Sequence, residues 1–584
     1  MAFGYAFLDL TKEDKLDRRH LLDLYASIAQ ISAVAILVLL QLRFIASWAL
    51  TRFAVAPDSE MPSSPYLKAE KQNRHSLSFL RRFSLFSRQV QWWMGEEVIR
   101  GWGTRGEWVG GALWTLWLLF LCVNQTGQDY FALTKRFGIV GVSQLPMHYL
   151  LATKTPYSPL QILTRSSHEQ LQAIHQVLGR VITFFFVLHA IFYLNSFFQK
   201  GILLDRLQNS RVVIIGLTSI SLFIILGSTA LAWIRRWSYR VFYASHIIIA
   251  LAVLPLLYFH VHQTHIFIWE TLVVYVLHMI ARFISLRTYD GTISMVADTN
   301  LIRVEIPLRK SVSDGAWWPG SHVYLRIPRH QSMASTAVTR LKETIGLRTN
   351  PFTVASVPQL DRKVVLVARA MKGNTKELAD LAHSLSMGSG EAASLRLKID
   401  GPYGASSWLP DFTEFDSILL VAGGVGATFI VPLWRSICMT RGKDGRSHAD
   451  KVRFVWAVQK LADTKWFFPS AEANTVLPHV GHGAASSHVT NRADDDAGEN
   501  IELEEREHLM GSSGDAPAET PGLIVKYGRP RLDAIVSDCF AVPGSRVAVL
   551  VCGPQSMSTE LRQDVGKWVK KGRDAFWHAE AFGL

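Results

Sequence analysis

Cysteine and charged residues are both scarce in this chain of 584 residues. Its four cysteines (Cys122, Cys438, Cys539 and Cys552) are scattered without metal-ligand spacing, which argues against a disulfide framework and against a zinc site. Charged residues make up 19% of the chain, and no basic–aromatic patch accompanies the net charge of +13, so nucleic acid is not an expected partner. The N-terminus lacks the layout of a cleavable signal peptide, so the first apolar run is expected to remain as a helix.

Long apolar runs are abundant instead. With 49% hydrophobic residues and a mean hydropathy of +0.16, the composition indicates membrane segments. Runs long enough to span a bilayer lie near 24–50, 107–126, 172–198, 211–234, 241–262 and 266–287. A shorter run over 137–152 contains Pro146 and is predicted as a seventh span, because the others then alternate sensibly. Seven spans place the arginine-rich 51–106 and 235–240 segments on the side of the C-terminal tail, as expected if that tail is cytoplasmic.

Two of the apolar runs carry a histidine near each end. His175 and His189 are fourteen positions apart, and so are His246 and His260. Fourteen helical residues rise about 21 Å and make nearly four turns, so the two histidines of each run lie on one face. Since both helices are expected to run in the same direction, we predict that His175 faces His246 and that His189 faces His260. Two facing imidazole pairs at two depths suit two stacked haems.

A single buried histidine taken alone would more simply be a hydrogen-bonded structural residue. The matched spacing in two helices favours ligation, since ionisable residues at membrane depth are rare and usually functional. Other histidines lack this pairing and are interpreted as interfacial or packed: His148, His168, His262, His265 and His278. For His262 and His265, contact with a metal-ion substrate at the outer mouth is the alternative.

After Arg287 the sequence alternates between strands, turns and short helices. In "NPFTVASVP", Pro351 sets a turn and Thr353 offers a hydroxyl at a strand edge, and "KGNTKELADL" opens a helix at Thr375 whose N-terminal amides suit a phosphate. "VAGGVGAT" over 421–428 is a glycine turn between a buried strand and a helix, which lets the backbone approach a pyrophosphate. The acidic segment at roughly 470–520 is predicted to be a disordered insertion.

Taken in order, these features resemble the ferric reductase transmembrane family, within the superfamily that also contains the NADPH oxidases. The likeness covers about residues 105 to 584. It rests on "HEQLQAIHQVLGR" and "RRWSYRVFYASH" in the histidine helices, on "PGSHVYL", "NPFTVAS" and "GPYG", and on "VAGGVGAT", "VWAV", "CGP" and "HAEAFGL". It implies a cytoplasmic module like ferredoxin–NADP reductase that carries FAD and NADPH, and two b-type haems held by His175, His189, His246 and His260.

The resemblance also assigns residues to the two nucleotide cofactors. The flavin would be lined by Pro351, Phe352, Thr353 and Ser356 with His322 nearby, and its pyrophosphate would be held by Gly373 and Thr375. The nicotinamide nucleotide would be bound by Gly423, Gly424, Gly426, Cys552, Gly553 and Pro554. Glu580 and Phe582 would sit at the nicotinamide–flavin junction, which makes Thr353, Cys552, Glu580 and Phe582 the implied catalytic residues.

Two positions depart from the family pattern. Asn350 stands where a histidine usually precedes "PFT", and an amide can donate a hydrogen bond but cannot carry charge. The chain ends in Leu584 where many relatives have an aromatic residue, so shielding of the flavin would fall to Phe582.

The expected fold class is a multi-domain membrane protein. An N-terminal helix and linker over 1–104 precede an all-α transmembrane haem bundle of six helices over 105–288. A β-barrel FAD domain over 289–412 and an α/β NADPH-binding domain over 413–584 follow, with the insertion near 470–520 in the last of these.

The expected function is a membrane oxidoreductase, a ferric-chelate reductase. It would pass electrons from NADPH through FAD and two haems to ferric or cupric chelates across the membrane. The expected location is the plasma membrane, among membrane lipids, and a downstream iron transporter is an expected partner. A superoxide-producing NADPH oxidase is the nearest alternative, and a non-enzymatic haem-binding membrane sensor is a second. The choice between NADPH and NADH is left open by the sequence.

Overall fold

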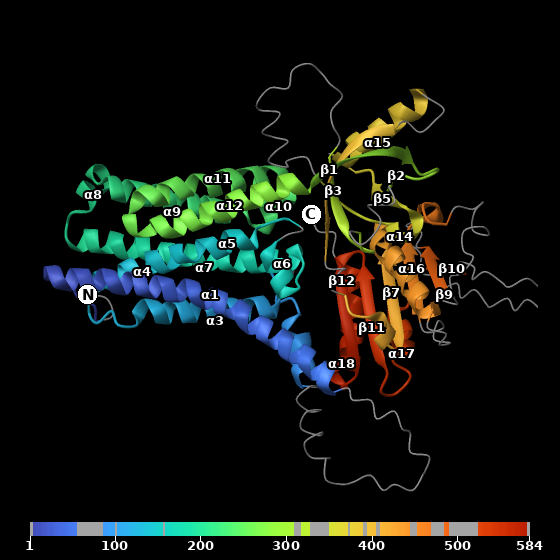
Figure 1. Cartoon of the computed structure of the whole chain (residues 1–584), viewed down its shortest axis with the longest axis horizontal. Coiled ribbons are helices and arrows are strands. Elements are labelled where there is room, and N and C mark those ends of the chain that lie inside the picture. The colour runs from blue at the N-terminus through green and yellow to red at the C-terminus, as the bar shows by residue number, and fades with distance from the viewer. Residues whose placement is uncertain are drawn as a thin grey trace, which may run out of the picture. The chain divides into compact units, whose positions relative to one another are not determined.

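The structure is a computed structural model that describes residues 4–54, 86–99, 102–155, 158–308, 317–326, 350–371, 374–388, 394–404, 409–443, 452–468, 484–489 and 524–580. The chain divides into two compact units, one up to Leu286 and one that begins at Arg287 (Figure 1). Gly373, Phe582 and Leu584 lie outside the described residues.

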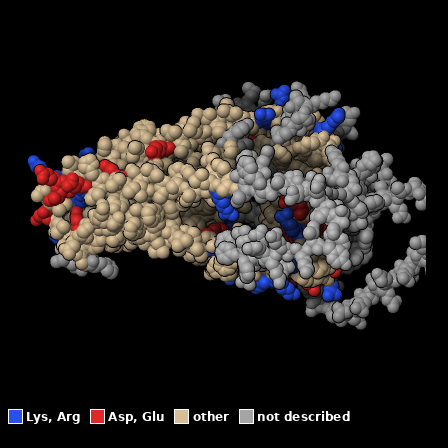
Figure 2. All heavy atoms as spheres, turned by 60° about the horizontal axis from the view of Figure 1, so that its bottom comes forward, with Lys and Arg blue, Asp and Glu red and all other residues tan. Residues whose placement is uncertain are grey.

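The first unit consists of helices. The long ones are α1 (Lys12–Ala54), α3 (Arg105–Val123), α7 (His168–Gln199), α9 (Arg211–Thr229), α11 (Tyr239–His260) and α12 (His265–Ser285). Shorter ones are α4 (Tyr130–Ser143), α5 (Leu145–Leu151), α6 (Pro159–Thr164), α8 (Leu203–Asn209) and α10 (Ala232–Trp237). In the described part of the chain, six helices are long and apolar enough to cross a membrane. Figure 2 shows few charged side chains over the middle of this bundle and a group of them at its end.

The seventh predicted span, over 137–152, differs from the structure. The segment is divided between α4 and α5, which meet at Gln144, and Pro146 lies in the first turn of α5. A proline lacks the amide hydrogen and clashes with the preceding turn, so it suits the start of a new helix and not the interior of an old one. Neither piece has the roughly 20 residues that a spanning helix needs. The prediction of one spanning helix here is therefore wrong.

Local signals explain where the two histidine helices begin. Ser167 caps α7 by accepting the amide of Gln170, whose side chain in turn accepts the amide of Ser167, a complete capping box. Ser238 caps α11 by accepting the amide of Val241. Helix α9 packs against both α7 and α11. The sequence therefore starts both helices with a hydroxyl cap, and the packing brings them together through a common neighbour.

The second unit begins with an antiparallel sheet that is nearly closed. Its strands are β1 (Leu286–Met295), β2 (Leu301–Pro307), β3 (His322–Arg326), β4 (Asn350–Thr353), β5 (Lys363–Arg369) and β6 (Ser394–Tyr403), in the order β4-β3-β6-β1-β2-β5. An antiparallel bridge between Val354 and Leu366 joins the two edges. Helices α14 (Pro358–Asp361) and α15 (Asn374–Gly388) accompany it. The prediction of a β-barrel domain is confirmed.

A parallel sheet follows. Its strands are β7 (Ser417–Gly423), β8 (Val452–Val458), β9 (Ala484–Val489), β10 (Ile524–Tyr527), β11 (Arg546–Cys552) and β12 (Asp574–Glu580), in the order β10-β9-β8-β7-β11-β12. Its helices are α16 (Ala427–Lys443), α17 (Leu532–Cys539) and α18 (Gln555–Lys570). The strand order reverses between β7 and β11, and in such sheets a ligand binds beyond the carboxyl ends of the strands at that point. The predicted α/β domain is confirmed.

Strand β9 corrects one part of the sequence analysis. Residues 484–489 lie inside the segment predicted to be disordered, yet they pair in parallel with β8 on one side and β10 on the other. Their sequence, Ala-Ala-Ser-Ser-His-Val, has little apolar alternation, so the sheet's main-chain hydrogen bonds and not a side-chain pattern define this strand. The rest of the 470–520 segment lies outside the described residues.

The barrel and the parallel sheet share one hydrophobic core. Leu301 and Val367 of the barrel belong to the same buried cluster as Phe429 and Leu433 of α16. Arg435 of α16 also makes a two-pronged ion pair with Asp361, at 2.7 and 2.9 Å. Paired donors of this kind fix geometry as well as adding attraction. The second unit is therefore packed as one body, with the flavin-type and nucleotide-type folds in direct contact.

Candidate functional site

The histidines of α7 and α11 meet in the predicted pairs. The ring centroids of His175 and His246 lie 6.3 Å apart, and those of His189 and His260 lie 6.4 Å apart. We call these the first pair and the second pair. Within each pair the ring planes are tilted strongly, by 62° in the first and 80° in the second. The pairing deduced from helix spacing and direction is confirmed.

Main-chain carbonyls orient three of the four rings. The Nδ1 atoms lie 3.0 Å from the His148 carbonyl for His175, 2.8 Å from the Thr134 carbonyl for His189, and 3.0 Å from the Val212 carbonyl for His260. A carbonyl can only accept, so Nδ1 must carry the proton and Nε2 is left with its lone pair. Metal-binding imidazoles are typically held in this way by their second nitrogen. The Nδ1 of His246 is buried without a partner among the described residues.

Glycines make room for the rings of the second pair. A Cβ at Gly138 in α4 would lie 2.7 Å from Nδ1 of His189, and a Cβ at Gly216 in α9 would lie 2.7 Å from Cε1 of His260. Neither distance is compatible with an ordinary side chain at those positions. Sequence reasoning missed both glycines, because nothing in the local pattern of α4 or α9 indicates which residue across the bundle a glycine faces.

The two pairs fit a haem better than they fit a bare metal ion. An imidazole nitrogen binds a first-row metal at about 2.0–2.1 Å, so one ion between two imidazoles places the ring centres about 6 Å apart. Within the described ranges no group of three or more His, Cys, Asp and Glu side chains could hold a metal by itself. A haem iron needs only one or two ligands from the protein, and two imidazoles can supply them, since the macrocycle provides the others. The residues present therefore fit this group.

Histidines outside the pairs have other contacts. His265 stacks on Tyr258 with ring centroids 3.9 Å apart, and its Nε2 lies 2.9 Å from the Tyr258 carbonyl. The ring of His262 lies 4.6 Å from that of His265. Nε2 of His278 accepts the amide of Lys154 at 3.2 Å. These contacts match the interpretation of packed histidines.

One face of the barrel gathers the predicted flavin residues. In the register of β3 and β4, His322 lies opposite Thr353 and Tyr324 lies opposite Pro351, and opposed residues of an antiparallel pair share a face. Tyr403 of β6 joins them, with its ring 5.8 Å from His322 and 5.6 Å from Tyr324. Tyr324 and Tyr403 were missed as site residues, although two-residue alternation in "HVYL" already places Tyr324 on the face of His322.

The hydroxyl of Thr353 is the polar feature of this face. It is buried and has no hydrogen-bond partner in the described part of the chain, and the same holds for the hydroxyl of Ser321 beside it. Buried polar groups in folded proteins almost always have a partner. A bound molecule with hydrogen-bonding atoms would supply one, so the face fits the polar edge of a flavin ring.

Three other predicted flavin residues are used differently. Phe352 points the opposite way from Thr353 and belongs to the buried core of the barrel. The hydroxyl of Ser356 donates to the Lys363 carbonyl and accepts the amide of Val365, both at 2.9 Å. The hydroxyl of Thr375, in the first turn of α15, accepts the amide of Met371 at 3.0 Å. The side chains of Phe352 and Ser356 thus have structural partners within the barrel.

The glycine turn after β7 lies at the reversal point of the parallel sheet. Gly424 has a φ of +54°, and a Cβ there would meet nothing within 4 Å. Its carbonyl accepts the indole N–H of Trp456 at 2.9 Å. The backbone at Gly424 is therefore fixed by the Trp456 hydrogen bond and faces open space, so that a phosphate could approach it.

The neighbouring glycines are needed for packing within the protein. A Cβ at Gly426 would lie 2.0 Å from the carbonyl oxygen of Cys552, and one at Gly423 would lie 2.6 Å from Cδ of Pro554. Gly553 is confined likewise, since a Cβ there would lie 2.4 Å from Cε of Met557. The two strand ends, β7 and β11, therefore approach each other closely because glycine occupies these positions, which brings Cys552 and Gly424 to the same edge of the sheet.

Cys552 and Glu580 are cross-strand neighbours in β11 and β12. Burial raises the pKa of the Cys552 thiol well above its usual range, and the Glu580 carboxylate raises it further. The thiol therefore stays protonated and neutral. Glu580 also hydrogen-bonds His578 at 3.0 Å, and the His578 ring stacks near Phe429.

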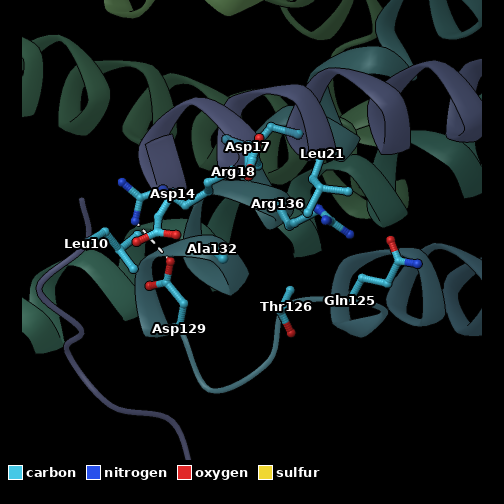
Figure 3. Close-up of a pocket in the computed structure, with 11 residues that line it drawn as sticks. Leu10, Asp14, Asp17, Arg18, Leu21, Gln125, Thr126, Asp129, Ala132 and Arg136 are labelled. Carbon is cyan, nitrogen blue, oxygen red and sulfur yellow. Dashed lines mark hydrogen bonds and ion pairs between the residues drawn. The ribbon is translucent and has the colours of Figure 1, made fainter. Parts of the chain in front are cut away.

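A separate cavity of about 160 Å³ lies between α1 and the start of α4 (Figure 3). Arg18, Asp129 and Arg136, which line it, have partners within the protein. Arg18 pairs with Asp129 at 3.0 Å. The buried Arg136 donates to the carbonyls of Leu121 and Asn124 at the end of α3, and its guanidinium lies 3.8 Å from the centre of the Tyr25 ring. Cations often satisfy the last carbonyls of a helix in this way. These contacts give the charges a structural use.

Known proteins match the chain along most of its length. Three family models match in succession: "Ferric reductase like transmembrane component" over 137–257, "FAD-binding domain" over 289–407, and "Ferric reductase NAD binding domain" over 415–566. "Ferric reductase transmembrane component 1" of Schizosaccharomyces pombe is 24% identical, covering 77% of this chain and 79% of that protein.

Two further relatives are similar in extent. "Probable metalloreductase AIM14" of Meyerozyma guilliermondii is 26% identical, covering 78% of this chain and 85% of that protein. "Ferric/cupric reductase transmembrane component 2" of S. pombe is 22% identical, covering 76% of this chain and 80% of that protein. With a matching membrane part, flavin part and nucleotide part in the same order, the chain belongs to the ferric reductase family.

Proposed function

We propose that this protein is a transmembrane ferric-chelate reductase that carries electrons from cytoplasmic NADPH, through FAD and two b-type haems, to ferric or cupric chelates on the other side of the membrane. The observation that carries the proposal is the presence of two facing imidazole pairs, 6.3 and 6.4 Å apart, in a membrane bundle that precedes a flavin-type barrel. The names of the yeast relatives support a ferric or cupric acceptor.

The residues of the bundle would fix two redox groups at two depths. Nε2 of each paired histidine would hold a haem iron, and the carbonyls bonded to Nδ1 of His175, His189 and His260 would hold those three rings in the required tautomer. When bound, FAD exchanges a hydride for single electrons, which haem can accept one at a time. Gly138 and Gly216 would keep clear the space that the rings of the second pair occupy.

The second unit would bind and orient the electron donor. Thr353, with its unpartnered hydroxyl, would face the flavin together with His322 and Pro351. Gly424 would offer its open backbone to the nucleotide phosphates, beside Gly423, Gly426, Gly553 and Pro554. Cys552 and Glu580 would flank the nicotinamide, with a neutral thiol that neither repels nor attacks it. Phe582, Gly373 and Thr375 keep their proposed roles at the flavin.

We further propose the membrane arrangement that this direction of electron flow requires. The second unit would lie in the cytoplasm, the first pair would lie on the cytoplasmic side, and the protein would reside in the plasma membrane near an iron transporter. The domain limits at 104, 288 and 412 belong to the same proposal. The arginine-rich segment over 235–240, between α9 and α11, supports it, because such segments favour the cytoplasmic side.

The test is acceptor-dependent oxidation of NADPH in purified membranes, with a ferric chelate, a cupric salt and oxygen as separate acceptors. We expect reduction of the ferric or cupric compound and two haems per chain. His189→Ala should remove one haem and abolish metal reduction while flavin stays bound, whereas His20→Ala, an exposed histidine of α1, should change neither. Oxygen consumption without metal reduction would favour an oxidase, and a full haem content in His189→Ala would refute the ligand assignment.

A further inference from the structure

His148 lies in α5, outside both histidine pairs, yet it contacts His175 twice. Its main-chain carbonyl accepts the Nδ1 proton of His175 at 3.0 Å. Its own ring stacks on the His175 ring, with centroids 3.9 Å apart and planes only 8° from parallel. A single residue thus contacts both the edge and the face of one imidazole in the first pair.

Helix α7 has a gap that accommodates the His148 ring. Gly179 follows His175 by four positions, so both lie on one face of the helix. A Cβ at Gly179 would come within 3.0 Å of Cε1 of His148. Nδ1 of His148 is buried and has no partner in the described residues. The ring is therefore held in its place by packing against His175 and Gly179.

The second pair has no equivalent of this ring. Tyr193 lies 5.0 Å from His189 and meets it edge-on, at 70°. Across the described ranges, His175 is alone among the four paired histidines in having a ring stacked parallel on it. The two pairs resemble each other in separation. The first differs in two respects, the ring stacked on His175 and the Nδ1 of His246 that has no partner in the described residues, and the stacked ring is the one that acts on His175.

We propose that His148 is a positioning residue, which fixes the plane of the His175 ring and thereby tunes the haem that the first pair would hold. This inference rests on the proposed haem sites. A hydrogen bond at Nδ1 restrains one atom of the ring, whereas a stacked neighbour restrains the plane. In low-spin ferric haem, the orientation of the axial ligand planes sets the splitting of the iron orbitals. The electron paramagnetic resonance signal, in particular its largest g-value, reports that splitting.

The test compares variants of the full-length, haem-loaded protein by this resonance. His148→Leu removes the aromatic ring and should shift the largest g-value of the first-pair haem, leaving the second-pair signal at its wild-type position as an internal check of folding. His148→Phe keeps a flat ring and should restore the wild-type value. In both variants residue 148 retains its main-chain carbonyl. Repeating the series in the His189→Ala background isolates the first-pair signal.

A second variant moves the His148 ring without changing it. Gly179→Ala introduces a Cβ that the ring must avoid, so it should shift the same signal in the presence of all native histidines. Gly227→Ala in α9 is the matched control, since a Cβ there meets nothing within 4 Å, and it should shift neither signal.

An unshifted first-pair signal in His148→Leu would overturn the inference. So would a shift in His148→Phe as large as that in His148→Leu, because the imidazole's polarity and not its stacking would then matter. A wild-type protein that binds no haem would instead refute the proposed function, which is a separate result.

Discussion

Single residues on the barrel face show how a binding site can be less stable than its surroundings. The Thr353 hydroxyl is buried without a partner, whereas the hydroxyl of Thr464, also buried, donates to the Leu461 carbonyl at 2.7 Å. A buried polar group left unpaired costs about 1–3 kcal/mol. The flavin-free protein would carry that cost at position 353, and a bound flavin would remove it.

Thr353→Val should therefore separate stability from flavin binding. We expect the flavin-free protein to unfold at a higher temperature, since the unpaired hydroxyl is gone. The free energy of unfolding should rise by about 1 kcal/mol. The same substitution should lower the amount of FAD retained through gel filtration. Thr464→Val is the control, and it should lower the unfolding temperature because it leaves a carbonyl without its donor. A Thr353→Val protein that keeps its full flavin would show that the hydroxyl does not face the cofactor.

Cys552 is expected to be chemically inert despite its place at the site. Because burial and the Glu580 carboxylate raise the pKa of its thiol, the thiol is neutral at and above the pH where a free cysteine ionises. We expect iodoacetamide at pH 8 to label Cys552 only after denaturation, as measured by mass spectrometry of the peptides. The raised pKa also means that, as the pH rises past the ordinary thiol range, ionisation favours the unfolded state. Rapid labelling in the folded protein would contradict this account.

At the scale of elements, the turn between β7 and α16 combines two uses of glycine. Gly424 adopts a left-handed conformation and faces open space, while Gly426 faces the Cys552 carbonyl of β11. The first use serves a ligand and the second serves the contact between two strand ends. Substitutions at the two positions should consequently fail in different ways.

We predict that Gly424→Asn leaves the protein folded and impairs nucleotide binding. Asparagine tolerates the left-handed region better than other residues, and its side chain would project into the space that the phosphates need. Gly426→Ala should instead destabilise the second unit by about 1–3 kcal/mol or more, because a Cβ cannot be placed 2.0 Å from a main-chain oxygen. Thermal unfolding and the Kd for NADPH, measured on both proteins, would distinguish these outcomes. Normal NADPH affinity in a folded Gly424→Asn protein would place the phosphates elsewhere.

At the scale of the whole molecule, the proposed haem sites and the proposed nucleotide sites lie in different parts of the chain. The imidazole pairs belong to the unit that ends at Leu286, and the glycine turn and barrel face belong to the unit that begins at Arg287. All four paired histidines lie before Leu286, and none belongs to the second unit. Damage to one part should thus leave cofactor binding in the other intact.

Gly424→Asn in the full-length protein tests this separation. We expect both haem absorbance bands to be present in membranes and to respond to dithionite as in the wild type. NADPH, by contrast, should reduce these haems much more slowly, and reduction of a ferric chelate should slow to the same extent. Wild-type protein and Gly227→Ala serve as controls. Haem reduction by NADPH at the wild-type rate would show that electrons enter without the turn after β7.

Several features were predictable because they depend on local geometry. Helical rise and twist place His175 and His189 on one face of their helix. The alternation of successive membrane spans gives the two histidine helices the same direction, so the pairing with His246 and His260 followed from the sequence. The strand–turn–helix reading of "VAGGVGAT" was equally local and agrees with β7 and α16. The family and the fold class were both confirmed. Even so, Pro146 in the first turn of α5 shows that hydropathy alone misjudges a segment with a helix breaker.

Other features depend on which distant residues meet, and only the tertiary structure decided them. The carbonyls of Thr134 and Val212 became partners of His189 and His260 through packing of separate helices. Strand β9 exists because two neighbouring strands offer main-chain hydrogen bonds, and Gly426 is required because β11 ends beside it. From the sequence, His148 was interpreted only as an interfacial or packed histidine. Its stacking on His175 depends on how α5 lies against α7. Local sequence thus determined the elements and the pairing of the histidines, while side-chain environment was set by contacts between residues far apart in the chain.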